Sequence, residues 1–207
     1  MSCYKIIEKD SIGAAWLAAA RYVLKAGRPV DFGDVAAREV LNLQVTVRNP
    51  RRDDPIVQQY GDQEMIDFMM GNFFGEKSVE EWGYSYRERI FTRDGLDRLV
   101  SNLKEKGNST WSVFTLLRPG EDGKHVPCLT QIQALVREER LCLVCYFRSQ
   151  DIGLKLYADL LALTEVGEMI KERVKTPSLE MVLHIASAHI YREDIPRLEK
   201  ILRERPL

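Results

Sequence analysis

Segments dense in β-branched, aromatic and other apolar residues occupy the second half of the chain and flank one long candidate helix. Such segments are typical of strands, and here they comprise Trp111–Leu117, Leu129–Val136, Leu141–Arg148 and Met181–Tyr191. The candidate helix covers Ile152–Ile170, where leucines recur at helical spacing. Strands arranged around one long helix restrict the chain to a fold in which a sheet and its helices share one core.

The first half of the chain adds mostly helices. Apolar residues at helical spacing, or in a short apolar run, predict helices over Asp10–Ala26, Gln63–Met70 and Arg93–Glu105. The alternating segment Arg38–Val47 predicts another strand. No linker or repeat divides the chain, so we predict one α+β domain over residues 1–207. Its sheet should be mostly antiparallel or mixed, with the helices on one face.

Composition narrows the range of functions. The chain has 207 residues, 45% of them hydrophobic and 29% charged, and its net charge is −1. Because the chain has no overall basic character, we expect no polymeric nucleic acid as a partner, although a few arginines could still hold a small anion. No segment approaches the roughly 20 apolar residues of a membrane span. With four cysteines and no signal-peptide pattern, we expect a cytoplasmic protein without a membrane partner.

Two of the cysteines, Cys142 and Cys145, form a C-x-x-C pair, a spacing that occurs in redox and zinc sites. They fall inside a predicted strand, where residues three apart point to opposite faces. The sequence has no second pair and no histidine cluster near them. We therefore favour a structural role for both thiols and predict no metal site.

A third cysteine, Cys128, follows Pro127 at the junction between a polar loop and a predicted strand. At such a junction a thiol can be an exposed nucleophile or an ordinary half-buried residue. Further along, Arg148, Ser149 and Asp151 lie at a strand-to-helix junction. A guanidinium and a hydroxyl near a helix N-terminus suit a phosphate group, whereas Ser149 or Asp151 could also simply cap the helix.

Taken together, these motifs resemble the thymidylate synthase family in order and approximate spacing. The resemblance is carried by Pro127-Cys128 with Gln133, Arg148-Ser149-x-Asp151, His189-x-Tyr191, Glu64–Gly71 and Trp82–Arg87. The chain is similar in length to the compact archaeal form. The resemblance implies a thymidylate-synthase-like fold and a homodimer joined sheet to sheet.

The resemblance also implies an activity, which is one-carbon transfer to C5 of a pyrimidine nucleoside monophosphate (dUMP to dTMP at family level). The Cys128 thiolate would add to C6 of the ring. The carbon donor would be 5,10-methylene-tetrahydrofolate or a related reduced pterin. The resemblance implies that Arg148 binds the phosphate and supports the thiolate, and that Ser149 and Gln133 help to bind the nucleotide. His189 and Tyr191 would contact the sugar, and Glu64 would transfer protons. Asp151 and Trp82 would contact the pterin.

The sequence also departs from the family pattern. Thr110 and Trp111 stand where the family has two phosphate-binding arginines that reach the neighbouring subunit. Arg38 is our first candidate to replace them, with Arg87 and Arg118 as others.

Asp159 occupies the place of the base-reading asparagine of the family, so we include it among the catalytic residues. An ionised carboxylate can accept a hydrogen bond from the amine of cytosine but cannot donate to O4 of uracil. A dCMP or CMP hydroxymethylase is therefore an alternative. A second alternative is a catalytically degenerate relative that only binds nucleotide, because the arginine pair and the family's C-terminal tail lack counterparts.

Overall fold

The computed structural model describes residues 4–75, 83–92, 95–123 and 125–205. A seven-stranded sheet runs through it in the order β1-β3-β7-β6-β5-β4, and β2 pairs with β3. Its strands are β1 (Lys5–Lys9), β2 (Arg28–Phe32), β3 (Val35–Val47), β4 (Val113–Thr115), β5 (Leu129–Arg137), β6 (Arg140–Asp151) and β7 (Ser178–Tyr191). The pairs β1–β3 and β6–β7 are parallel and the other pairs are antiparallel. The predicted α+β fold with a mixed sheet is confirmed.

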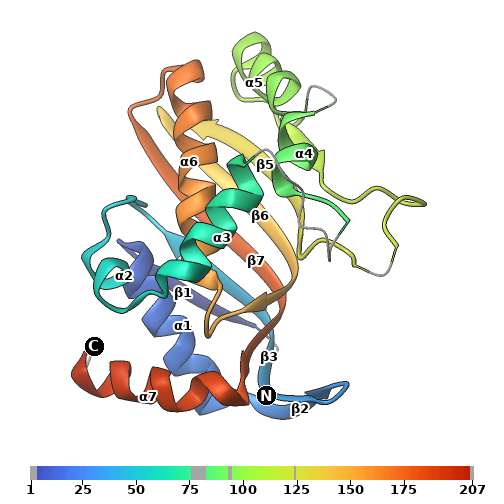
Figure 1. Ribbon diagram of the computed structural model, residues 1–207. Helices are drawn as coiled ribbons and strands as arrows, with labels where there is room; N and C mark the ends of the chain where they lie inside the picture. The colour runs from blue at the N-terminus through green and yellow to red at the C-terminus, as the bar shows by residue number, and fades with distance from the viewer. Residues whose placement is uncertain (1–3, 76–82, 93–94, 124, 206–207) are drawn as a thin grey trace.

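Helices cover one face of this sheet (Figure 1). They are α1 (Ile12–Ala26), α2 (Pro55–Tyr60), α3 (Gln63–Phe74), α4 (Tyr86–Phe91), α5 (Gly95–Lys106), α6 (Leu156–Val174) and α7 (Ile195–Glu204), with a short 3₁₀ turn over Arg192–Asp194. Helix α1 packs on β3 and β7, and α6 packs on β6 and β7. Helix α3 lies on α6, which makes α6 the centre of the core. No helix within the described ranges is both long enough and apolar enough to cross a membrane.

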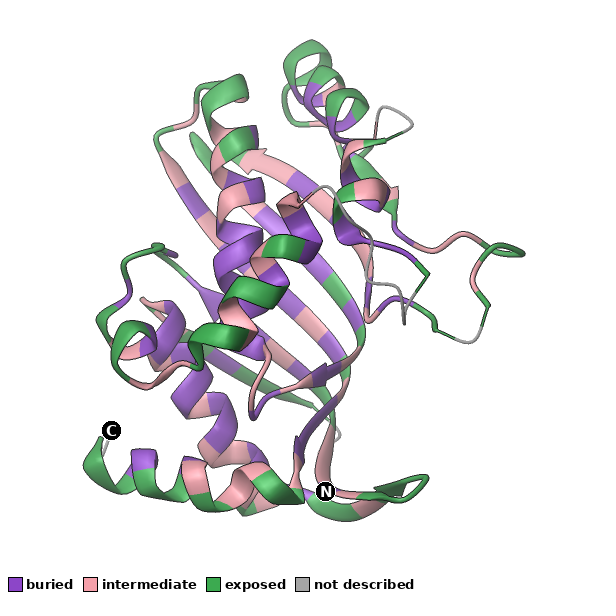
Figure 2. Ribbon diagram, viewed as in Figure 1, coloured by how far each residue is buried: buried purple, intermediate pink, exposed green. Residues whose placement is uncertain are grey.

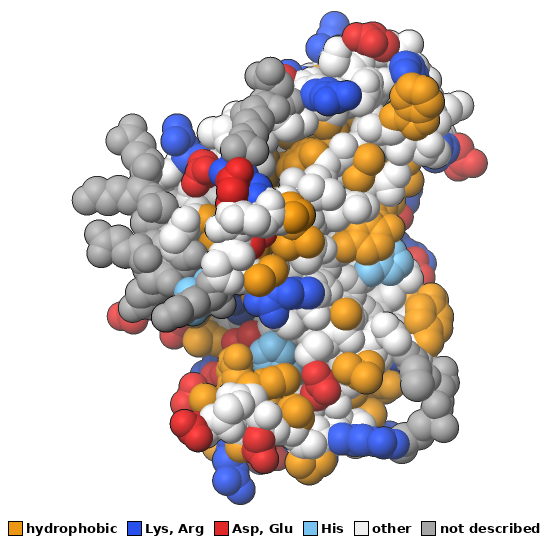
Figure 3. All heavy atoms as spheres, turned by 90° about the vertical axis from the view of Figure 1, so that its right-hand side faces the viewer, with side chains coloured by type: hydrophobic (Ala, Val, Ile, Leu, Met, Phe, Trp, Pro, Cys, Tyr) orange, Lys and Arg blue, Asp and Glu red, His pale blue; other side chains and the backbone are white. Residues whose placement is uncertain are grey.

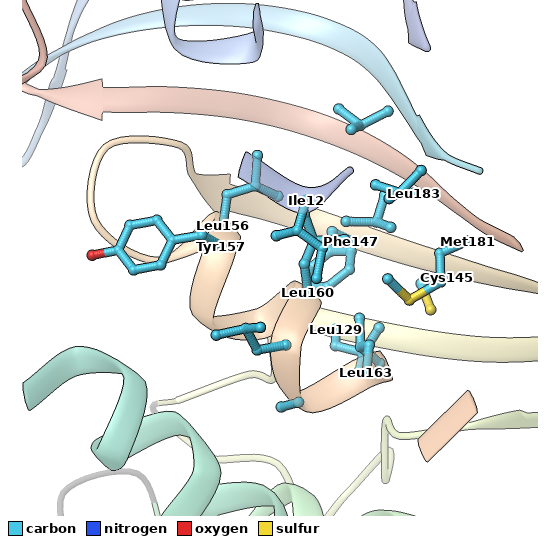
Figure 4. Close-up of a cluster of buried hydrophobic side chains, with 14 of the residues drawn as sticks. Ile12, Leu129, Cys145, Phe147, Leu156, Tyr157, Leu160, Leu163, Met181 and Leu183 are labelled. Atoms are coloured by element: carbon cyan, nitrogen blue, oxygen red, sulfur yellow. The ribbon is translucent and has the colours of Figure 1, made fainter. Parts of the chain in front are cut away.

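Helix α6 is central because it connects two parallel neighbours, β6 and β7, and such a connection must cross one face of the sheet. Leu156, Leu160 and Leu163 of α6 are fully buried. They lie close to side chains of the strands, among them Phe147 and Leu183 (Figure 4). Burial is concentrated in the middle of α1, α6 and the central strands, whereas α7 and β2 are largely exposed (Figure 2).

Side-chain caps fix where several helices begin. Ser11, Asp62 and Ser85 each accept a hydrogen bond from a backbone N–H in the first turn of α1, α3 and α4, respectively. The buried carboxylate of Asp54 caps α2 and also accepts from Gly13 N of α1 at 2.9 Å. The loop before α2 is therefore held against α1.

The structure shifts some predicted boundaries. Residues 152–155 form turns, so α6 begins at Leu156 rather than Ile152. Trp16 Nε1 donates to Ile152 O at 2.9 Å, which fixes this turn on α1. Helix α3 continues through Gly71 to Phe74 and ends at Gly75. The strand expected over Trp111–Leu117 shrinks to β4.

Candidate active site

A cavity of about 430 Å³ opens where β5 begins and where β6 and β7 end. It is lined by Phe32, Tyr84, Tyr86, His125, Val126, Cys128, Arg148, Ser149, Gln150, Asp151, Lys155, His189 and Tyr191. The strand pairing explains why residues distant in sequence meet here, since Asp151 of β6 lies opposite His189 of β7. A nucleophile, two cations, one carboxyl group and several aromatic rings therefore border one cavity.

Cys128 is the nucleophilic side chain of this cavity. It is half-buried, and its Sγ lies 3.5 Å from Ser149 Oγ. Its carbonyl oxygen accepts from Arg148 N at 2.9 Å. The next residue, Leu129, donates its N–H to the hydroxyl oxygen of Tyr86 at 3.1 Å. These contacts fix the backbone on both sides of the thiol, so the sulfur has a defined position at the cavity wall.

The guanidinium of Arg148 organises the loop that leads to Cys128. Its Nη2 donates to Val126 O at 2.7 Å, and its Nε lies 3.2 Å from the carbonyl oxygens of Val126 and Pro127. Its Nη1 donates to Ser149 Oγ at 3.1 Å. The residue is exposed at the cavity, where a planar guanidinium suits an anionic oxygen.

An aromatic wall closes the side of the cavity formed by β7. The His189 ring lies 5.0 Å from Phe32 and 4.9 Å from Tyr191, both edge-on. Burial lowers the pKa of His189, so the imidazole is neutral at neutral pH. Its Nδ1 is buried and has no hydrogen-bond partner among the described residues.

Asp151 borders the cavity at the end of β6. Its Oδ1 accepts from Gly153 N at 2.8 Å and from Leu154 N at 3.3 Å. Burial, followed by the nearby charge of Asp194, raises the pKa of Asp151 to about 6. The folded protein therefore binds the Asp151 proton more tightly than the unfolded chain does.

We expect Asp151→Asn to make stability less sensitive to pH. Because the folded pKa is raised, the stability contributed by the protonated acid is present below the unfolded pKa and is lost as pH rises through about 6. The amide cannot ionise, so the variant should gain about 1 kcal/mol relative to wild type between about pH 5 and about pH 7.5. Urea unfolding at both pH values measures this difference. A constant difference between the two proteins would contradict the prediction.

The back wall of the cavity contains a buried charge pair. Lys155 Nζ lies 3.3 Å from Asp159 Oδ2, and Gln150 Nε2 donates to the same oxygen at 2.7 Å. Lys155 and Gln150 line the cavity, whereas Asp159 is fully buried behind them. Burial lowers the pKa of Lys155, but the charge and hydrogen bond of Asp159, together with the nearby Cys128 and Tyr84, outweigh this effect, so the pKa lies above its ordinary value. The ammonium is therefore charged at neutral pH.

The structure brings most of the predicted site residues together. Those that line the cavity are Cys128, Arg148, Ser149, Asp151, His189 and Tyr191. Trp82 lies outside the described residues. The sequence interpretation passed over Lys155 and Gln150, and it noticed Tyr84 and Tyr86 only as part of a motif. A lysine four residues before Asp159, on the same side of the predicted helix, was the available signal for Lys155.

Other predicted site residues lie away from the cavity. Glu64 is exposed in the first turn of α3. Gln133 Nε2 donates to Thr110 O at 3.0 Å, and Arg38 Nη2 donates to Gly27 O at 3.1 Å. Arg38 borders a separate hollow that includes Arg192. No group of three or more His, Cys, Asp or Glu side chains in the described part of the chain is placed to hold a metal ion.

Known proteins that are similar to this chain share one family name. A protein of Methanosarcina mazei named "Putative thymidylate synthase" is 24% identical over 206 residues, covering 96% of this chain and 95% of its own length. A protein of Methanopyrus kandleri with the same name is 31% identical over 150 residues, covering 70% of this chain and 68% of its own. The sequence model described as "Thymidylate synthase" matches residues 51–207. The chain thus belongs to the thymidylate synthase family.

Proposed function

We propose that the protein converts dUMP to dTMP through a covalent adduct of Cys128, with a reduced pterin as the carbon donor. One-carbon transfer to a pyrimidine nucleotide is the chemistry of the family. The observation that carries the proposal is the position of Cys128 Sγ, 3.5 Å from Ser149 Oγ. The same hydroxyl accepts a hydrogen bond from Arg148, and all three residues line the cavity. A nucleophile beside an anion-binding group is what attack on a nucleotide base requires.

The residues that line the cavity have different roles in this reaction. Arg148 and Ser149 hold the phosphate. The thiolate adds to C6 of the pyrimidine, which makes C5 nucleophilic. The neutral His189 and the hydroxyl of Tyr191 reach the sugar hydroxyl from the aromatic wall. The contacts to the phosphate and to the sugar orient the nucleotide so that C6 of the base faces the Cys128 sulfur.

A methylene-folate type of co-substrate is general in the family, and Asp151 suits such a group. A reduced pterin presents N–H donors, and a carboxyl group held at the cavity by two backbone N–H groups offers an acceptor for them. When bound, the methylene-pterin supplies the one-carbon unit. Asp151 orients its ring against the nucleotide and keeps the reacting carbon near C5.

The cytidylate alternative depends on contact between Asp159 and the base. Here the Asp159 carboxylate is fully buried behind Gln150 and Lys155 and accepts hydrogen bonds from both. The carboxylate is therefore not placed to accept a hydrogen bond from the C4 amine of cytosine, which supports uracil as the base. We propose dUMP as the substrate and methyl transfer as the outcome.

Release of tritium from C5 tests the proposed function. The protein is mixed with a methylene-pterin and with C5-labelled dUMP or dCMP. Rapid release from dUMP, accompanied by dTMP formation, is the expected result. Release from dCMP alone would transfer the assignment to a hydroxymethylase. Binding without release from either nucleotide would indicate a relative that has lost catalysis.

We expect Arg148→Lys to raise the KM for dUMP and to slow tritium release. Lysine keeps the charge, but it cannot bond phosphate, Ser149 Oγ and the carbonyl of Val126 together. A loss of about 2 kcal/mol, or roughly thirtyfold in kcat/KM, is expected for a charge-assisted hydrogen bond. Arg203→Lys is the matched control, because Arg203 is exposed in the last turn of α7 and does not line the cavity. Equal kinetics in both variants would place the phosphate elsewhere.

We also propose that the protein is a homodimer that pairs through the open face of the sheet. On this face Tyr146 stacks on His184 with ring centroids 5.0 Å apart, and Tyr4 and Ile6 are exposed. Hydrophobic side chains are spread over much of the surface seen from the right-hand side of Figure 1 (Figure 3). We expect Tyr146→Lys to shift the protein to a monomer, because it places a charge among apolar rings. Sedimentation that shows a wild-type monomer would contradict the dimer.

A further inference from the structure

We propose that Lys155 donates a hydrogen bond to O4 of the pyrimidine, which selects a C4 carbonyl and stabilises the charge that forms on O4 after Cys128 attacks. The inference rests on the proposed function for the reaction but concerns a residue that the proposed steps do not use. Asp159 acts through Lys155 as a positioning residue. Three features of the back wall carry the argument, namely the placement of the ammonium, its charge, and the donor chemistry of the side chains around it.

The first feature is placement. Lys155 directly precedes α6, and the turn that carries it is fixed by the bond between Trp16 Nε1 and Ile152 O. Its side chain is 15% exposed, and the exposed part belongs to the cavity wall that also holds Cys128. Its Nζ lies 6.0 Å from the centre of the Tyr86 ring. The hydroxyl of that ring accepts from the residue after Cys128, so the ammonium and the thiol share one part of the cavity.

The second feature is charge. A lysine at the back of a cavity loses most of its hydration, which is costly unless a partner replaces the water. Asp159 is that partner, with its Oδ2 at 3.3 Å from the ammonium, and Gln150 Nε2 donates to the same oxygen at 2.7 Å and holds the carboxylate in place. The pair therefore keeps a fixed ammonium at the cavity wall. A preorganised cation in a partly desolvated site stabilises developing negative charge strongly.

The reaction creates such a charge. When the sulfur of Cys128 bonds to C6, the C5–C6 π bond breaks and its electron pair spreads over C5, C4 and O4 as an enolate. The ammonium of Lys155 donates an N–H to this oxygen and keeps its proton. When C5 then bonds to the one-carbon unit, the C4 carbonyl reforms and the charge leaves O4. Lys155 thus binds the intermediate more tightly than the free base, which accelerates the step.

The third feature is donor chemistry, which separates uracil from cytosine. An ammonium has donors only, so it suits the C4 carbonyl of uracil and opposes the C4 amine of cytosine. The NH₂ group of Gln150 donates to Asp159, so the acceptor of this amide is Oε1. This oxygen is buried and has no hydrogen-bond partner among the described residues. An acceptor next to a donor matches the N3–H and O4 of uracil, with one group for each.

The test compares nucleotide binding with C5 chemistry in matched variants. Lys155→Met removes the N–H groups at similar length, but it leaves Asp159 without its cation. Lys155→Met/Asp159→Leu removes both charges, so it separates loss of the donor from loss of stability. Lys155→Arg retains the charge. Lys171→Met is the control, because Lys171 lies near the far end of the same helix and pairs with Glu168.

Two measurements are made on each protein, namely calorimetric binding of dUMP and dCMP without pterin, and tritium release from labelled dUMP with pterin. Wild type and Lys171→Met should bind dUMP about tenfold or more tightly than dCMP, and the double variant should lose this preference. Tritium release in the double variant should fall about a hundredfold, with partial rescue in Lys155→Arg.

The two measurements separate the inference from the proposed function. A double variant that folds and keeps the dUMP preference would overturn the inference, whether or not the wild type turns over. A wild type that releases no tritium, but binds dUMP with a preference that depends on Lys155, would overturn the proposed function and leave the base-reading role of Lys155 supported. A double variant with the wild-type rate of release would overturn the role of Lys155 in stabilising O4.

Discussion

Replacing Cys128 with serine is expected to lower turnover by roughly three orders of magnitude or more, while the fold stays intact. A serine hydroxyl is almost entirely protonated at neutral pH and is a far weaker nucleophile than a thiolate. The substitution preserves side-chain size at a half-buried position, and Ser149 Oγ, 3.5 Å from the sulfur, can still hydrogen-bond to the new hydroxyl. Tritium release measures the loss, and thermal unfolding checks the fold.

The matched control for this experiment is Cys142→Ala. Cys142 lies on β6 as a free thiol and does not line the cavity. Burial raises its pKa to about 11, so it is protonated and unreactive at neutral pH. Removing it should alter stability more than rate. A serine variant of Cys128 with undiminished turnover would exclude a covalent adduct at this residue.

The largest expected effect on stability comes from breaking the buried pair with Asp159→Leu. The Asp159 side chain is fully buried, and the substitution would leave the ammonium of Lys155 in the cavity wall without its carboxylate. Loss of one partner of a buried pair costs about 3 kcal/mol, which lowers the Tm of a chain of this length by about 6 to 12 °C. Urea unfolding of the variant without nucleotide measures the loss.

The double variant Lys155→Met/Asp159→Leu serves as the control here too. With both charges removed, no uncompensated ion remains, so most of the lost stability should return. Restoration would show that the cost arises from the unpaired charge rather than from the shape of the new side chain. A single variant as stable as wild type would mean that the ammonium reaches water when Asp159 is absent.

Sequence patterns predicted the core of this fold well, because its central elements have strong periodicity. The strands around α6, and α6 itself, consist of long apolar runs, so the sequence shows directly which residues are buried. Patterns failed at the edges of the fold. Strands β1 and β2 are short and expose most of their residues, so neither shows the alternation expected of a half-buried strand. Helix α7 buries only Leu198, Ile201 and Leu202, a stripe too narrow to stand out beside its many charges.

The site was predictable where its residues are neighbours on paired strands. Cys128 directly precedes β5 and Arg148 lies on β6, the strand that pairs with β5, so the two short motifs around them are brought together by one hairpin. The resemblance assigned Glu64 to the site, but Glu64 is exposed on α3 and does not line the cavity, because periodicity does not fix which side of α3 faces the site. The role of Lys155 depends on the turn at Ile152 and on its pairing with Asp159, and both are tertiary features. The sequence shows a lysine and an acid at helical spacing, a pattern that is far more common on exposed surfaces.

The parallel pairing of β6 with β7 has a consequence for the order in which the chain folds. Strands β5 and β6 form a hairpin, so the part of the cavity around Cys128 requires only local loop closure. His189 and Tyr191 arrive only after α6 has crossed the sheet and β7 has paired with both β6 and the distant β3. Contacts of such long sequence separation form slowly. We therefore expect the nucleophile half of the site to form early, and the aromatic wall to complete it in a late folding step.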